Sequence, residues 1–195
     1  MLTIAWDVDD TLNDLMYIWF EEWWRSKHPD CRLSYEDLTE NPPHRLLGIT
    51  KTDYQDSLDT FRLSGHYSRL LPNPAVLRWF EEHGHRYRHI VLTAVPRVAA
   101  SISASWVMTH FGAWLRTFHF VPTPRSSDSI PAYESSKAEY LKWLGLADVF
   151  IDDNPGSVRE VRSLGIRSYL TSRPWNGGGM DIDLILESLV NISET

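Results

Sequence analysis

A group of acidic side chains follows the first apolar segment of the chain, and the chemistry of the protein should be sought at these side chains. Residues 2–6 are mostly apolar, and Asp7, Asp9 and Asp10 come directly after them. Carboxylates that lie this close repel one another, and they stay ionised when a hard cation lies among them. Because ligands that offer only oxygen suit Mg²⁺, the segment predicts a reaction that uses a carboxylate and a divalent cation.

Polar side chains also follow two later apolar segments. Thr93 follows residues 89–92, and the pair Asp152 and Asp153 follows residues 149–151. Lys137 stands at the start of the helical segment that precedes this pair. A site that combines a divalent cation, a lysine and a hydroxyl suits a phosphoryl group with two negative charges.

Each of these features has an ordinary structural explanation when it is taken alone. An Asp-x-Asp segment is often a solvated turn, and Asp7–Leu12 lacks the glycine and glutamate that a calcium-binding loop needs. Asp152 and Asp153 could simply stabilise the start of the next helix. The joint occurrence of these residues, each at the end of a strand or the start of a helix, favours catalysis.

The elements that must position these residues alternate from Leu71 onward. Strands are expected at 2–6, 89–92, 118–121, 149–151 and 166–170, and helices at 74–83, 96–111, 136–144, 155–164 and 182–190. Ser135 is expected to cap the third of these helices, and Gly145 to end it. Such alternation predicts a parallel sheet covered on both faces. The carboxyl ends of its strands should meet at one edge, where ligands bind.

Residues 15–69 interrupt this alternation and contain no segment that alternates like a strand. Helices are expected at 15–26 and at 51–63, with Thr50 capping the second. The block is best explained as a lid over the same edge of the sheet. We therefore expect a core domain of residues 1–14 and 70–195, with a helical cap of residues 15–69.

Four segments together resemble the motifs of the haloacid dehalogenase (HAD) superfamily. Ile4–Leu12 resembles its first motif, Ile90–Thr93 its second, Lys137 its third and Val149–Asp153 its fourth. The resemblance implies an α/β fold: a Rossmann-like, three-layer parallel sheet with a small helical cap inserted after the first strand. The interval between Thr93 and Lys137 has room for one helix and one strand, so no large second cap is expected.

The resemblance also implies a mechanism. Asp7 is expected to be the nucleophile and to form an aspartyl-phosphate. Asp9 is expected to act as general acid and then as general base. A general acid at this position distinguishes phosphatases from dehalogenases, because a leaving halide needs no proton. The expected cofactor is Mg²⁺, held by Asp7, the backbone carbonyl of Asp9, Asp152 and Asp153.

Phosphate binding is assigned to Thr93, Lys137, Asp10 and Arg97. The resemblance implies that Thr93 donates a hydrogen bond to a phosphate oxygen, and that Lys137 offsets negative charge. Arg97 follows Thr93 by four residues at the start of a helix. It could therefore reach the phosphate, or it could be an ordinary surface arginine.

The layout further resembles that of the 5'(3')-deoxyribonucleotidases. The shared features are the segment 71–74, the small cap and the loop 173–176. That subfamily stacks a base on cap aromatics, and Tyr17, Phe20 and Trp24 could do so here, although they could equally form the core of the cap. The first motif departs from the subfamily, which has glycine and valine in place of Asp10 and Thr11. Nucleotides are therefore one candidate beside sugar phosphates and other small monoesters.

Composition narrows the partners. A net charge of −7 argues against binding to extended nucleic acid, and with it against a nucleic acid 3'-phosphatase. No apolar run is long enough to span a membrane, and a single cysteine is compatible with the reducing cytoplasm, where we expect the protein. The expected partner is a small phosphate ester. A phosphotransferase or mutase, and a binding protein without turnover, remain alternatives, and the sequence does not predict the oligomeric state.

Overall fold

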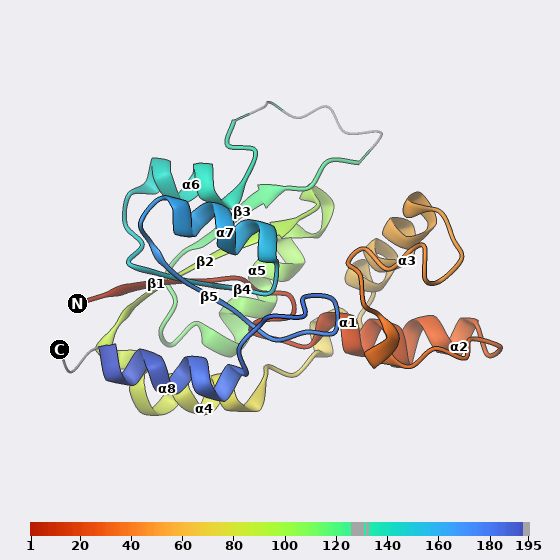
Figure 1. Cartoon of the computed structure of the whole chain (residues 1–195), viewed down its shortest axis with the longest axis horizontal. Coiled ribbons are helices and arrows are strands. Elements are labelled where there is room, and N and C mark those ends of the chain that lie inside the picture. Colours follow the sequence, from red (N-terminus) through yellow and green to blue (C-terminus); the bar gives the residue numbers. More distant parts are fainter. Residues whose placement is uncertain (126–130, 132, 193–195) are drawn as a thin grey trace.

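The computed structural model describes residues 1–125, 131 and 133–192, and it contains a five-stranded parallel sheet. The strands are β1 Thr3–Trp6, β2 Arg88–Val95, β3 Phe118–Pro122, β4 Val149–Asp152 and β5 Arg167–Leu170. Their order is β3-β2-β1-β4-β5, so the first strand lies in the centre. The ends of β2 and β4 therefore flank the end of β1, where the acidic group begins (Figure 1).

Helices cover both faces of this sheet (Figure 1). They are α4 Pro74–His83, α5 Arg97–Phe111, α6 Lys137–Leu144, α7 Pro155–Ser163 and α8 Ile182–Ile192. Successive side chains of a strand point to opposite faces. Accordingly, Ile4 and Trp6 of β1 pack with α4, α5 and α8, whereas Ala5 packs with α6 and α7. The three-layer α/β architecture expected from the sequence is confirmed.

Helix α6 begins one residue later than the sequence indicated. The side chain of Ser136, and not that of Ser135, accepts a hydrogen bond from the backbone N–H of Glu139. Ser135 instead donates its hydroxyl to the Glu139 carboxylate, at 2.8 Å. Lys137 is therefore the first residue of α6. Gly145 ends the helix in the left-handed conformation (φ 64°), as expected.

The cap is helical and lies beyond the carboxyl ends of the strands (Figure 1). Its elements are α1 Leu15–Ile18, the π-helical turn η1 Trp19–Trp24, α2 Arg25–Lys27, η2 Tyr35–Asp37, α3 Lys51–Leu63 and η3 Tyr67–Arg69. The single helix expected at 15–26 is thus an α-helical run with a π-helical middle. Helix α3 has the predicted bounds, and Thr50 caps it by accepting from the backbone N–H of Asp53 at 3.1 Å.

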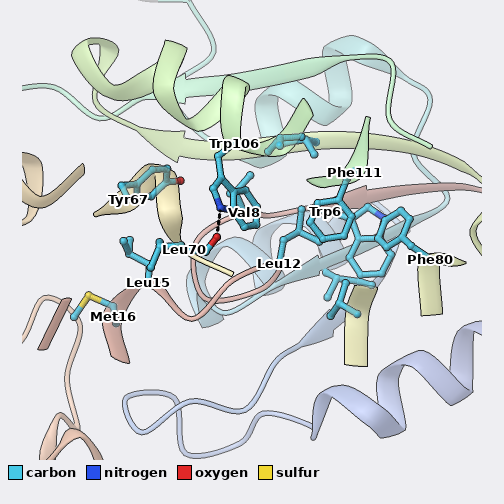
Figure 2. Packing of buried hydrophobic residues seen from close by; sticks show 14 of the residues in the cluster. Trp6, Val8, Leu12, Leu15, Met16, Tyr67, Leu70, Phe80, Trp106 and Phe111 are labelled. Atoms are coloured by element: carbon cyan, nitrogen blue, oxygen red, sulfur yellow. Dashed lines mark hydrogen bonds between the residues drawn. The ribbon is translucent and has the colours of Figure 1, made fainter. Parts of the chain in front are cut away.

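The entry and exit of the cap are tied together at the core. The backbone N–H of Asn73 donates to the carbonyl of Leu12 at 2.8 Å, and Asn13 forms an isolated β-bridge with Pro72. The indole of Trp106 donates to the carbonyl of Leu70 at 2.8 Å within the buried cluster shown in Figure 2. These bonds fix both points where the chain crosses between core and cap. Within the described residues, no helix is long and apolar enough to cross a lipid bilayer.

Candidate active site

Three carboxylates converge at the carboxyl edge of the sheet. Asp7 directly follows β1, Asp152 is the last residue of β4, and Asp153 comes next; all three are buried. One oxygen from each lies within 4.8 Å of the others. Asp7 is held at this place because its backbone N–H donates to the carbonyl of Ile151, which continues the pairing of β1 with β4.

Lys137 bridges two of these carboxylates. Its ammonium lies 2.8 Å from Asp7 Oδ1 and 2.7 Å from Asp152 Oδ2. Burial opposes the charge on Lys137, but Asp152 and Asp7 outweigh it and hold its pKa above the ordinary value. Lys137 is therefore a fixed positive charge at the edge where a phosphoryl group would lie.

The remaining charge fits a divalent cation. Burial raises the pKa of Asp7 to about 7 despite Lys137, and Asp152 adds to the rise. Burial, and next to it the charge of Asp152, also raise the pKa of Asp153 well above its usual range. If all three carboxylates are ionised, the single ammonium of Lys137 leaves two negative charges without a positive partner. Because all the donors are oxygens, the site suits a hard divalent cation, a class to which the expected Mg²⁺ belongs.

The loop after β5 holds Asp153. The indole N–H of Trp175 donates to Asp153 Oδ2 at 3.0 Å, and the side-chain amide of Asn176 donates to the Asp153 carbonyl at 2.8 Å. Arg173 reaches the first motif, where its Nε donates to the carbonyl of Asp10 at 2.9 Å. The loop therefore joins the two acidic segments.

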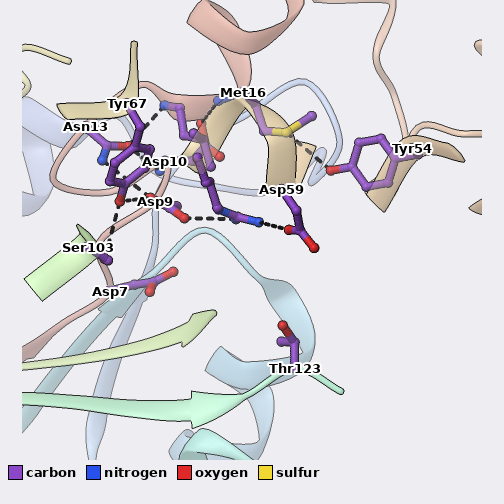
Figure 3. A network of polar contacts seen from close by, with 12 residues as sticks. Asp7, Asp9, Asp10, Asn13, Met16, Tyr54, Asp59, Tyr67, Ser103 and Thr123 are labelled. Carbon is purple, nitrogen blue, oxygen red and sulfur yellow. Dashed lines mark hydrogen bonds and ion pairs between the residues drawn. The ribbon is translucent and has the colours of Figure 1, made fainter. Parts of the chain in front are cut away.

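The Asp9 carboxylate contacts the cap (Figure 3). Arg62 of α3 donates to Asp9 Oδ2 at 2.9 Å, and the Tyr67 hydroxyl donates to Asp9 Oδ1 at 2.9 Å. Arg62 also lies 3.4 Å from Asp59, which pairs with Arg125 of the core at 2.6 and 2.9 Å. A chain of charges therefore runs from the core through α3 and back to the core.

Sequence reasoning missed both Arg62 and Tyr67. A signal for Arg62 was present, because Tyr54, Leu58 and Phe61 form the buried stripe of α3 and Arg62 falls beside it. A buried arginine normally has carboxylate partners. Nothing in the local sequence points to Tyr67, whose role depends on how η3 packs against α5.

The structure brings most of the predicted site residues to one cavity of about 270 Å³. Asp7, Asp9, Asp10, Thr93, Lys137, Asp152 and Asp153 line it. Thr93 lies inside β2 rather than after it, because this strand runs on to Val95. The Asp10 carboxylate accepts from the backbone N–H of Met16 at 3.0 Å, so it also stabilises the start of the cap.

Arg97 is not brought to this cavity. It is an exposed residue at the start of α5, and it does not line the cavity within the described structure. The positively charged side chain that contacts Asp9 is instead that of Arg62, on helix α3 of the cap. The geometry therefore does not support the phosphate-binding role expected for Arg97.

The aromatic residues considered for base stacking are not at the cavity either. Phe20 and Trp24 are buried in the hydrophobic core of the cap, and Tyr17 is exposed. None of the three lines the cavity among the residues that the structure describes. The cap residues that line it are Leu15, Met16, Asn41, Pro42, Tyr54, Leu58 and Arg62.

Comparison with known proteins identifies the fold. No protein-family model and no curated protein matches the sequence. Among solved structures, the chain is similar to the haloacid dehalogenase-like hydrolase SP0104 of Streptococcus pneumoniae (15% identity, 98% of both chains, TM-score 0.54). It is also similar to a putative beta-phosphoglucomutase of Thermotoga maritima (16% identity, 98% of this chain and 100% of that chain, TM-score 0.54).

A third similar structure is the L-2-haloacid dehalogenase PA0810 (14% identity, 97% of this chain and 99% of that chain, TM-score 0.55). These identities are too low to transfer an activity, but the alignments extend over nearly the whole chain. The protein therefore has the haloacid dehalogenase-type fold, with the carboxylate cluster at the carboxyl edge of its sheet.

Proposed function

We propose that this protein is a magnesium-dependent phosphomonoester hydrolase that acts through an aspartyl-phosphate on Asp7. The observation that carries the proposal is the cluster of Asp7, Asp152, Asp153 and Lys137 in one cavity at the end of the central strand. Asp9 lies two residues after Asp7 and lines the same cavity. This set can bind a phosphoryl group, attack it and donate a proton to the group that leaves.

In the first step, an oxygen of the Asp7 carboxylate attacks phosphorus. The bond between phosphorus and the leaving oxygen breaks, and Asp9 transfers its proton to that oxygen. Asp7, Asp152, Asp153 and the backbone carbonyl of Asp9 would hold Mg²⁺, which would supply charge neutralisation at the phosphoryl oxygens. The ammonium of Lys137 adds to this effect, and Thr93 donates to a phosphate oxygen.

In the second step, Asp9 is the general base. It takes a proton from water as the water oxygen attacks phosphorus, and the bond between phosphorus and Asp7 breaks. Phosphate leaves, and Asp7 returns to its carboxylate form. The same carboxyl group thus serves both steps, because the first step leaves it deprotonated for the second.

The position of Asp9 favours phosphate esters over halogenated acids. A leaving alkoxide needs a proton, whereas a leaving halide does not. Asp9 lines the cavity, and its two oxygens are held by Arg62 and Tyr67. A positioned acid of this kind is useful to a phosphatase, although the fold is shared with a dehalogenase.

The substrate that best fits the cavity is a small phosphorylated metabolite. The cavity has about 270 Å³, below the ~300–1,000 Å³ that is typical of ligand pockets, and it must hold both the phosphoryl group and the cation. Leu15, Met16 and Leu58 give its cap side an apolar wall. A (deoxy)nucleoside monophosphate remains within the proposed substrates, but small leaving groups fit this volume more readily.

Phosphoryl transfer to an alcohol is the second candidate, as in a mutase. The ion pairs Arg62–Asp9 and Asp59–Arg125 hold the cap against the core over this cavity. A phosphoryl group on Asp7 would therefore be covered, and an alcohol that fits the cavity could take it in place of water. Transfer to an added alcohol, measured against release of free phosphate, separates the two reactions.

The test of the proposed function is release of phosphate from p-nitrophenyl phosphate. We expect the wild type to release phosphate with Mg²⁺ and not after its removal by a chelator. Asp7→Asn should abolish release, whereas Asp56→Asn, which changes an exposed acid on α3, should not. Release that is independent of Mg²⁺, or that survives in Asp7→Asn, would contradict the mechanism. No release from folded, Mg²⁺-loaded wild type would favour a binding protein without turnover.

A further inference from the structure

The Asp9 carboxylate has a separate partner for each of its oxygens (Figure 3). Tyr67 donates to Oδ1 at 2.9 Å, and the side-chain amide of Asn13 lies 3.4 Å from the same atom. Arg62 donates to Oδ2 at 2.9 Å. Tyr67 is 1% exposed, so its hydroxyl is a buried donor directed at the residue to which the proton transfer is assigned.

The Tyr67 hydroxyl is itself anchored to the core. It lies 3.3 Å from the hydroxyl of Ser103, a buried residue of α5. A tyrosine hydroxyl has one hydrogen, and here Asp9 accepts it. Ser103 must therefore donate to the tyrosine oxygen. Since η3 packs against α5 of the core as well as against α3 of the cap, the relay from Ser103 through Tyr67 ties Asp9 to the core.

We infer that Tyr67 is the positioning residue for Asp9, an inference that rests on the proposed function. By holding Oδ1, the hydroxyl fixes the plane of the carboxyl group and leaves Oδ2 for proton transfer. In the first step the proton passes from Oδ2 to the leaving oxygen as the bond between that oxygen and phosphorus breaks. Arg62 donates to Oδ2 in the substrate-free structure, so Oδ2 carries no proton there. The step therefore requires that Oδ2 leave Arg62 and take up a proton when the substrate binds, and the leaving oxygen then lies against Oδ2 in place of Arg62.

This role makes the effect of Tyr67 depend on the leaving group. A nitrophenolate leaves readily without a proton, whereas an alkoxide needs one. Removing the hydroxyl should therefore hinder the cleavage of an alkyl ester much more than that of a nitrophenyl ester. A merely structural role for Tyr67 would slow the cleavage of both esters alike.

The experiment compares p-nitrophenyl phosphate with benzyl phosphate, which has a similar ring and an alkoxide leaving group. The quantity measured is kcat/KM, because it reports only the steps up to departure of the leaving group and excludes the attack of water. For Tyr67→Phe we expect kcat/KM to fall roughly tenfold or more on benzyl phosphate and less than about twofold on p-nitrophenyl phosphate. Ser103→Ala should shift the ratio in the same direction by a smaller factor.

Tyr87→Phe is the matched control. Tyr87 is also buried, and its hydroxyl donates to the carbonyl of Leu189 at 2.6 Å, away from the cavity. It should lower stability without changing the ratio of the two kcat/KM values. Thermal unfolding shows whether each variant folds. If Tyr67→Phe does not fold, the test uses Ser103→Ala instead.

Equal losses on both esters, or no loss on either, would overturn the positioning role while leaving the proposed function intact. Failure of the wild type to release phosphate from both esters would instead remove the proposed function and this inference together. A selective loss on benzyl phosphate, absent in Tyr87→Phe, would establish Tyr67 as the residue that positions Asp9.

Discussion

At the scale of single residues, the three carboxylates of the cluster are the proposed metal ligands. They are buried beside the ammonium of Lys137, and the pKa values of Asp7 and Asp153 are still raised, because burial and the neighbouring carboxylates oppose ionisation. A divalent cation bound among the carboxylates would remove the unfavourable energy of ionising them together. This gain exists only in the folded protein, because only there do the three carboxylates lie side by side. Mg²⁺ should therefore stabilise the folded state by mass action.

We predict that Mg²⁺ at about 100 times its dissociation constant raises the free energy of unfolding by about 2.7 kcal/mol. Asp153→Asn should reduce this gain, because it removes one carboxylate from the cluster while an amide of the same size remains near Trp175. Thermal unfolding with and without Mg²⁺ measures the effect independently of turnover. The same gain in wild type and Asp153→Asn would exclude Asp153 from the metal site.

His89 gives a second prediction at this scale, far from the cavity. Its Nδ1 accepts from the Trp6 indole at 3.1 Å, and its Nε2 donates to the carbonyl of Gly84 at 2.8 Å, so the ring is neutral. Burial lowers its pKa from 6.5 to about 4. Below pH 6.5 the unfolded chain binds a proton that the folded protein does not, so stability is lost as the pH falls from 6.5 toward 4.

We expect His89 alone to cost about 2 kcal/mol of stability between pH 7.5 and pH 5. His89→Gln lacks this titration, so its free energy of unfolding should change less than that of the wild type over the same range. Urea unfolding at the two pH values measures the difference. Parallel changes in both proteins would show that folding does not lower the pKa of His89.

The residues of the site could be predicted from the sequence where the sheet alone positions them. Asp152 ends a strand, Asp7 and Asp153 directly follow one, and Lys137 begins a helix; parallel pairing brings such positions together. The sequence marks Arg62 as a residue beside the buried stripe of α3, but it does not link Arg62 or Tyr67 to Asp9, because both reach Asp9 only through the packing of the cap on the core. For Arg97 the sequence left both a phosphate contact and a surface position open, and closeness in sequence to Thr93 did not bring it to the cavity.

At the scale of elements, α3 is joined to the core by charge. Asp59 of α3 receives two bonds from Arg125, and Arg62 of the same helix reaches Asp9. The side chains of Asp59 and Arg125 are mostly buried, at 14% and 18% exposed. This pair therefore holds the cap closed more firmly than an exposed ion pair would.

We predict that Asp59→Asn loosens α3 and lowers the free energy of unfolding by about 2 kcal/mol. Hydrogen exchange of the α3 backbone amides should become faster, while the amides of β1 and β4 keep their protection. Asp56→Asn, on the same helix but exposed, is the control. Unchanged exchange in Asp59→Asn would mean that apolar packing alone holds the cap.

The sequence predicts the elements well where one face is apolar and the ends carry caps. Helix α3 has the predicted bounds because Thr50 and Asp53 cap each other. The run 15–26 was expected as one plain helix, but the large rings of Trp19 and Phe20 occupy its buried side, and its middle is π-helical. The local sequence pattern does not reveal this π-helical turn, because the turn depends on how those rings pack.

At the scale of the whole molecule, the cap limits the volume of the cavity above the carboxylates. Its residues close a cavity of about 270 Å³ over the carboxylates, and the aromatic rings of the cap are mostly used in its own core. The fold could be predicted from the alternation of elements, but the volume under the cap could not. The resemblance to nucleotidases in layout therefore did not determine the substrate.

We predict that kcat/KM is at least about tenfold higher for small alkyl monoesters such as glycerol phosphate than for nucleoside monophosphates. A misfit of a single methylene group already costs ~1–3 kcal/mol of transition-state binding. Leu58→Ala, which enlarges the cap side of the cavity, should narrow this difference. A panel of both substrate classes with the wild type and Leu58→Ala provides the measurement. A preference of the wild type for nucleotides would refute the size argument.

The central claim is that Asp7 becomes phosphorylated, and trapping this adduct tests it most directly. In Asp9→Asn the first step still proceeds with p-nitrophenyl phosphate, whereas attack by water lacks its general base. After acid quenching, mass spectrometry should find one phosphoryl group on the peptide that contains Asp7, only when Mg²⁺ is present. Finding the adduct on another residue, or no adduct on Asp7 while the wild type hydrolyses the same ester, would contradict the account.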